Sequence, residues 1–192
     1  MAIYKLSRYP KVLALSGGKT VSVRPMVASD APALLQFFRS IPEDERYFLK
    51  DDVASEAVVQ GWADHLDYDR ALPLLAFDGD SVCADAVLIR RRSGALAHAA
   101  EIRVVVGLEY RSKGLGLALL REVSDVAWDA ELECIHVEFI KDIQEDALNA
   151  TRLLGGIESG VQREAVKDQH DNHHDIVYMR IPLGRWWQWS QF

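Results

Sequence analysis

The sequence contains little cysteine and no long hydrophobic run. Cys83 and Cys134 are its two cysteines, and both fall in runs typical of strands, so a disulfide framework is excluded and a reducing compartment is favoured. No apolar stretch approaches the length of a membrane span, and residues 1–16 carry basic residues without the apolar centre of a signal peptide. We therefore expect a cytoplasmic protein with no membrane partner.

Basic residues are also fewer than acidic ones. Lysine and arginine number 22 against 29 acidic residues, which gives a net charge of −7. That balance argues against nucleic-acid binding and favours a cationic acceptor. The 192 residues are 49% apolar, enough for a large core, and no repeat or linker divides them. We expect one domain over residues 1–192, with an N-terminal hairpin arm at 1–17 and an aromatic tail at 183–192.

Hydrophobic periodicity predicts alternating strands and helices. Strands are expected at 12–15, 20–24, 71–77, 82–91, 98–106, 132–140, 157–166 and 176–181, and helices near 30–41, 55–66, 114–127 and 142–154. The segment 43–52 predicts a short acidic helix or a loop. This order indicates an α/β (α+β) fold with one mixed sheet of about seven strands, flanked by helices, and an extra N-terminal strand.

The segment 101–130 combines a buried strand, a glycine loop and an amphipathic helix. Its loop ends in Gly114-Leu115-Gly116, directly after Arg111 and Lys113. The first amides of a helix lack intrahelical partners and carry partial positive charge, so such a loop can hold a phosphate or pyrophosphate. The alternative is a tight turn with two glycines and a solvated basic pair. The string is not a P-loop, and Leu119 stands where a dinucleotide fingerprint needs its third small residue.

The loop resembles the acyl-CoA signature of the GNAT superfamily of N-acyltransferases, Arg/Gln-x-x-Gly-x-Gly/Ala. It is carried here by Arg111-Ser112-Lys113-Gly114-Leu115-Gly116, and the preceding residues 100–106 look like the fourth strand of that family. The opening 18–26 and the segment 45–48 are similar to the GNAT domain of bacterial protein-lysine acetyltransferases. The resemblance implies a GNAT-type fold, acetyl-CoA as cosubstrate and no metal.

The same resemblance assigns the acetyl-CoA contacts. It implies that the backbone amides from Ser112 to Gly116 bind the pyrophosphate. The pantetheine arm then lies between the strand that ends at Val106 and the strand 132–140, and pairs with amides of Val104, Val105 and Val106. Gln144 takes the position of an asparagine that many family members have at the start of the next helix.

Removal of a proton from the acceptor amine requires a base, because a lysine ammonium has an ordinary pKa near 10.4. Glu101 is the first candidate, since the protein-acetyltransferase relatives have a proposed catalytic glutamate at the same spacing before the motif. Its alternative is a strand-end residue paired with Arg103 or Lys141. Glu138 is the second candidate and His136, on the same side of its strand, is the third.

The chain departs from the family in its later motif. Thr151 stands where members commonly have a tyrosine or phenylalanine, so a phenol that could protonate the leaving thiolate is missing. Cys134 has no evident histidine partner and is expected in the core. His170, His173 and His174 match no metal template, and we expect a solvated hairpin loop there.

We expect an enzyme that transfers acetyl from acetyl-CoA to a primary amine, such as a protein lysine. Two alternatives stay open: a small-molecule amine or amino-acid N-acetyltransferase, and a non-catalytic acyl-CoA sensor. Three of the five tryptophans and a terminal phenylalanine lie in the last seven residues. Because large aromatic side chains are enriched at interfaces, this tail suggests a homodimer.

Overall fold

The computed structural model describes residues 4–184. These residues form an eight-stranded sheet made of β1 (Lys11–Ala14), β2 (Thr20–Pro25), β3 (Ala71–Asp78), β4 (Ser81–Arg90), β5 (Ala99–Val106), β6 (Cys134–Ile140), β7 (Ile157–Lys167) and β8 (His173–Pro182). The helices are α1 (Ala31–Ser40), α2 (Glu43–Arg46), α3 (Glu56–Asp64), α4 (Leu115–Asp129) and α5 (Glu145–Leu153), with short 3-10 turns at Leu6–Arg8, Ala28–Asp30 and Leu108–Tyr110. The expected mixed α/β fold and its extra N-terminal strand are confirmed.

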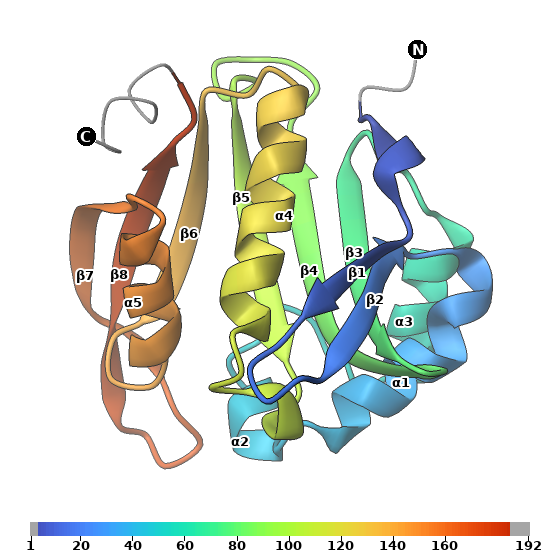
Figure 1. The fold of residues 1–192 in the computed structure, drawn as a ribbon. Helices are drawn as coiled ribbons and strands as arrows, with labels where there is room; N and C mark the ends of the chain where they lie inside the picture. The colour runs from blue at the N-terminus through green and yellow to red at the C-terminus, as the bar shows by residue number, and fades with distance from the viewer. Residues whose placement is uncertain (1–3, 185–192) are drawn as a thin grey trace.

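The strand order across the sheet is β1-β2-β3-β4-β5-β6-β8-β7. Every neighbouring pair is antiparallel except β5 and β6, which are parallel because α4 forms the crossover between them. Figure 1 shows α4 and α5 in front of the sheet and α1, α2 and α3 behind it. The parallel pair therefore lies near the middle of the sheet, between two layers of helices.

The two faces of the sheet form two separate cores. The α4 face contains alternate residues of β5 and β6, such as Ile102, Ile135 and Val137, packed with Leu115, Leu119 and Val123 of α4. The opposite face packs against α1 and α3 around Leu75 and Phe77, with Val105 at its margin. Because side chains alternate along a strand, Glu101 and Arg103 project on the same face as Val105.

The parallel pair separates soon after it begins. Pairing between β5 and β6 covers only Ala99 with Cys134, Ala100 with Ile135, and Glu101 with His136. Beyond these residues β5 continues on β4 as far as Val106, and β6 continues on β8 as far as Ile140. In the part of the chain that the structure describes, the two strands thus lose their common ladder after Glu101 and open toward the N-terminal end of α4.

The N-terminal hairpin belongs to the sheet and touches α4. β1 pairs with β2, Lys11 Nζ contacts the carboxylate of Glu122 of α4, and Tyr9 packs on the α4-side core. The turn of this hairpin reaches the glycine loop, where the amide of Ser16 donates to the carbonyl of Lys113 at 3.1 Å. Within residues 4–184, no helix is both long enough and apolar enough to cross a membrane.

Candidate active site

The glycine loop opens α4 with a left-handed residue. Gly114 occupies the N-cap position with φ 85°, and Ser112, two residues earlier, also has a positive φ of 55°. Among residues 4–184, no side chain caps the N-terminus of α4. A Cβ atom added to Gly114 would meet nothing within 4 Å, so the space in front of the first-turn amides is open. This geometry fits a bulky anion.

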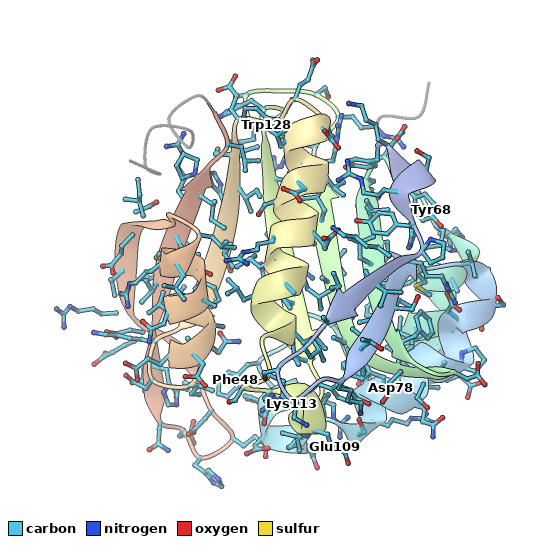
Figure 2. The ribbon with its side chains drawn as sticks, in the orientation of Figure 1. Phe48, Tyr68, Asp78, Glu109, Lys113 and Trp128 are labelled. Carbon is cyan, nitrogen blue, oxygen red and sulfur yellow. The ribbon has the colours of Figure 1, made fainter. Side chains whose placement is uncertain are left out.

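The rest of the loop lies close to β5. A Cβ atom added to Gly116 would lie 3.6 Å from the Val106 side chain, so the start of α4 lies directly against the end of β5. Leu115 is fully buried and packs in the core on the α4 face of the sheet. Lys113 donates to the carbonyl of Glu109 at 2.5 Å, and Figure 2 labels both beside the first turn of α4.

Arg111 is engaged with a segment far away in the sequence. Its guanidinium donates two hydrogen bonds to the Glu45 carboxylate of α2, at 2.9 and 2.6 Å, and its Nε donates to the Val106 carbonyl at 3.0 Å. Arg111 therefore joins the glycine loop, the end of β5 and α2. In this arrangement its charge is balanced by Glu45.

Glu101 and Glu138 lie together at the point where β5 and β6 separate. The ammonium of Lys50, from the segment after α2, contacts the Glu101 carboxylate at 2.8 Å and the Glu138 carboxylate at 3.2 Å. Arg103 donates from Nε to Glu101 at 3.0 Å and approaches Asp51 at 3.6 Å. The two leading base candidates thus share one lysine ammonium, which the sequence did not reveal.

These contacts set the pKa values of Glu101 and Lys50. Partial burial raises the pKa of Glu101, but hydrogen bonds from Lys50 and Arg103 outweigh it and hold that pKa below its ordinary value. For Lys50, burial lowers the pKa, and the hydrogen bonds to Glu101 and Glu138 outweigh this effect and raise it. The carboxylate is therefore ionised through the neutral range, ready to hold a cationic amine.

His136 and Cys134 form a pair that sequence reasoning missed. The Nε2 atom of His136 lies 3.6 Å from the Sγ atom of Cys134, so the expectation that this cysteine lacks a histidine partner is wrong. Positions i and i+2 of a strand share a face, which is the signal that could have identified the pair. Cys134 itself is 1% exposed, as expected for a core residue.

Gln144 and Thr151 have structural roles at the N-cap of α5 and within that helix. The side-chain oxygen of Gln144 accepts from the amide of Ile140 at 2.8 Å, which fixes the end of β6. Thr151 is fully buried and donates to the carbonyl of Ala147 at 2.9 Å. It therefore replaces the family's phenol with a structural hydroxyl.

The histidine-rich segment is more ordered than expected. His173 and His174 begin β8 instead of lying in a solvated loop. His174 packs edge-on against the ring of Phe48, with centroids 5.9 Å apart, and its Nε2 lies 3.4 Å from Asp168. In residues 4–184, no group of three or more histidine, cysteine or acidic residues could hold a metal ion.

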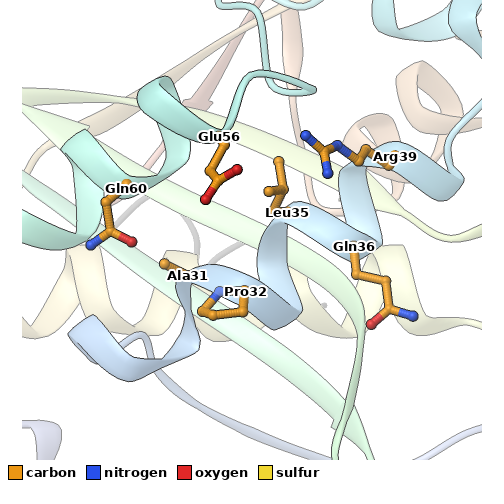
Figure 3. A pocket seen from close by; sticks show the side chains of 7 residues that line it. All are labelled: Ala31, Pro32, Leu35, Gln36, Arg39, Glu56 and Gln60. Carbon is orange, nitrogen blue, oxygen red and sulfur yellow. The ribbon is translucent and has the colours of Figure 1, made fainter.

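A separate hollow lies between α1 and α3, away from these residues. Figure 3 shows its lining, which includes Leu35 and Arg39 of α1 and Glu56 and Gln60 of α3. None of the site residues predicted from the sequence belongs to it. The glycine loop, the separated strands and the carboxylate pair are therefore the better candidate active site.

The combination of glycine loop, separated strands and paired carboxylates is compatible with an α/β fold that binds an acyl-CoA, and comparison with known proteins gives the family. The model of the Acetyltransferase (GNAT) family matches residues 34–155, more than half of the chain. The chain therefore belongs to the GNAT family of acetyltransferases, enzymes that use acetyl-CoA as the acyl donor. A search of curated proteins finds no match.

Solved structures agree on the fold. The GNAT domain of S. lividans PAT is 21% identical, with a TM-score of 0.71 over 92% of this chain and 98% of that domain. A phosphinothricin acetyltransferase from Sinorhizobium meliloti, solved with acetyl-CoA, is 20% identical, with a TM-score of 0.72 over 86% and 89% of the two chains. A ribosomal-protein-alanine N-acetyltransferase from Brucella melitensis is 18% identical, with a TM-score of 0.71 over 84% and 99%.

Proposed function

We propose that this acetyltransferase transfers the acetyl group of acetyl-CoA to a primary amine at the junction of β5 and β6. The observation that carries the proposal is the alignment of three features. Open amides at the start of α4 lie at one end of the strand separation, and the pair Glu101 and Glu138 lies at the other. From Glu101 to Val106 the strand rises roughly 17 Å at about 3.3 Å per residue, a length comparable with an extended pantetheine arm.

The donor contacts follow from this alignment. The amides from Ser112 to Gly116 would bind the pyrophosphate, with Arg111 and Lys113 adding positive charge. The edge of β5 at Val104, Val105 and Val106, which faces the separation, would hold the pantetheine arm. Arg111 would have to exchange Glu45 for a phosphate to contribute its charge, since the two are paired at 2.6 Å in the structure.

Glu101 would act as the general base. Its carboxylate accepts a hydrogen bond from a lysine ammonium, the group that an acceptor presents before it loses a proton. Because its pKa is low, it would work through transient proton transfer or an intervening water instead of storing the proton. Glu138 would hold the other side of the amine, and His136 is the third candidate. Gln144 would act indirectly, by fixing the end of β6.

A protein lysine is the acceptor that we favour. Lys50 shows that a lysine carried on a polypeptide can bring its ammonium to both carboxylates. The small-amine alternative predicts turnover of free amines or amino acids in preference to peptides.

An acceptor panel tests the assignment. The protein is mixed with acetyl-CoA and either lysine peptides or small amines, and acetylated products are identified by mass spectrometry together with thiol release. We expect acetyl-lysine on peptides. Turnover of small amines alone would overturn the peptide preference, and acetyl-CoA binding without any product would favour the sensor alternative.

We further propose a homodimer and a cytoplasmic location. The dimer rests on the aromatic tail, and residues 185–192 of that tail lie outside the described residues. Light scattering of the full chain and of a chain lacking residues 185–192 tests it, and two monomers would overturn it. The cytoplasmic location rests on two free thiols, Cys83 and Cys134, and on the use of acetyl-CoA.

A further inference from the structure

Lys50 occupies the position that the proposed function gives to the acceptor amine. Its ammonium bridges carboxylates on both strands, with Glu101 at the last paired position of β5 and Glu138 two residues past the paired part of β6. It therefore lies over the junction itself, at the thioester end of the proposed donor path.

The segment around Lys50 is anchored on both sides. Val53 is 5% exposed in the α1-side core, and Leu49 packs against the same core. Phe48 packs against His174 of β8, and the amide of Leu49 donates to the carbonyl of Arg46 at 2.9 Å. These contacts fix the backbone near the junction. The fold therefore positions the side chain of Lys50 against the carboxylates.

Glu101 has a second cationic partner. Arg103 pairs with it at 3.0 Å from the same strand, and Asp51 lies 3.6 Å from Arg103. Lys50 is the cation that contacts carboxylates of both strands, which is the position of a substrate amine. Its side chain is 44% exposed, which leaves room on the other side for an acyl group.

We propose that Lys50 is an acetylation site that the protein modifies on itself, in cis. The proposal rests on the proposed function. After loss of one proton through Glu101 to solvent, the neutral Nζ forms an N–C bond to the acetyl carbonyl carbon. The C–S bond of acetyl-CoA breaks, and the thiolate leaves with a second proton from the nitrogen as free thiol. The amide product carries no charge, so both carboxylates become available to an external amine.

The experiment follows acetylation of the purified full chain mixed with acetyl-CoA and no acceptor. Intact mass and peptide mapping should show a single acetyl group on Lys50, formed at a first-order rate that is independent of protein concentration. Lys167 is a matched internal control, because it is also exposed and also paired with a carboxylate, Asp171 at 3.1 Å, but lies at the end of β7. Equal labelling of Lys50 and Lys167 would mean uncatalysed acetylation and would overturn the proposal.

Two variants complete the test. Lys50→Arg keeps the positive charge and should remain unlabelled, and Glu101→Gln should slow labelling of Lys50 by about 10²–10⁴-fold, the range for a general base. A labelling rate that increases with protein concentration would overturn the cis assignment. Lysine peptides are assayed in parallel with the wild type, because an arginine at position 50 would keep a cation on both carboxylates. Peptide turnover together with an unlabelled Lys50 would overturn this inference alone, whereas failure of both reactions would overturn the proposed function as well.

Discussion

Asp85 is a buried charge whose removal should stabilise the protein at high pH. It lies on β4 between Leu75 of β3 and Val105 of β5, is 7% exposed, and its Oδ1 has no hydrogen-bond partner among the described residues. Burial raises the pKa of Asp85 from 3.8 to about 7. The shift of about three units corresponds to about 4 kcal/mol at 1.36 kcal/mol per unit.

The sign of the pH dependence follows from the raised pKa. Between about pH 4 and pH 7 the folded protein keeps the Asp85 proton that the unfolded chain has lost, so this group's contribution to stability falls as pH rises and levels off above about pH 7. Asparagine cannot ionise. The stability of Asp85→Asn relative to wild type should therefore rise by roughly 3 kcal/mol between about pH 5 and pH 8.

Urea unfolding of both proteins at the two pH values measures this double difference. Asp80→Asn is a suitable control, because Asp80 is exposed in the β3–β4 turn and its substitution should show no comparable change. A relative stability of Asp85→Asn that is the same at both pH values would refute the reasoning, since any cost of fitting the amide itself is independent of pH.

Three further substitutions test the site and its support. Gly114→Glu should abolish acetyl-CoA binding in calorimetry while the circular dichroism spectrum stays unchanged. Gly94→Glu, at a left-handed glycine in a remote loop, should bind acetyl-CoA normally. Binding by Gly114→Glu would refute the assignment of the glycine loop as the pyrophosphate site. Gly156→Ala should destabilise by about 1–3 kcal/mol in chemical unfolding, because its Cβ would lie 2.6 Å from a threonine methyl group of α5, and Gly160→Ala, with open space, should not. Glu45→Gln should tighten acetyl-CoA binding in calorimetry at low salt by releasing the loop arginine, and weaker binding would contradict that competition.

The order of strands and helices could be predicted because each element carries its own hydrophobic period. The strand 98–106 and the helix that begins at Leu115 are examples, with bounds that agree within a residue or two. The first residue of a helix is harder to predict from the sequence, because capping depends on local geometry. The helix expected from residue 142 begins after Gln144 instead, and the Gln144 side chain reaches back to Ile140.

The long-range contacts of the site could not be predicted. Lys50 and Glu101 are 51 positions apart, and Arg111 and Glu45 are 66 apart, so only the folded chain brings them together. In the sequence Lys50 is one charge in a charged segment, with no pattern that assigns it a partner. The spacing of Glu101 before the glycine motif, in contrast, is local and could be recognised through the family resemblance.

The pH–rate profile of wild type and Glu101→Gln, with acetyl-CoA and the best acceptor, tests the central claim most directly. In the wild type, the low pKa of Glu101 keeps the base ionised through the neutral range, so activity should fall only as pH drops well below neutrality. Near pH 7 the variant should have kcat lower by about 10²–10⁴-fold, with a defect that shrinks as pH rises and the amine loses its proton unaided. Glu133→Gln, an exposed control before β6, should follow the wild type. Wild-type turnover by Glu101→Gln near pH 7 would contradict the account and move the base to Glu138 or to solvent.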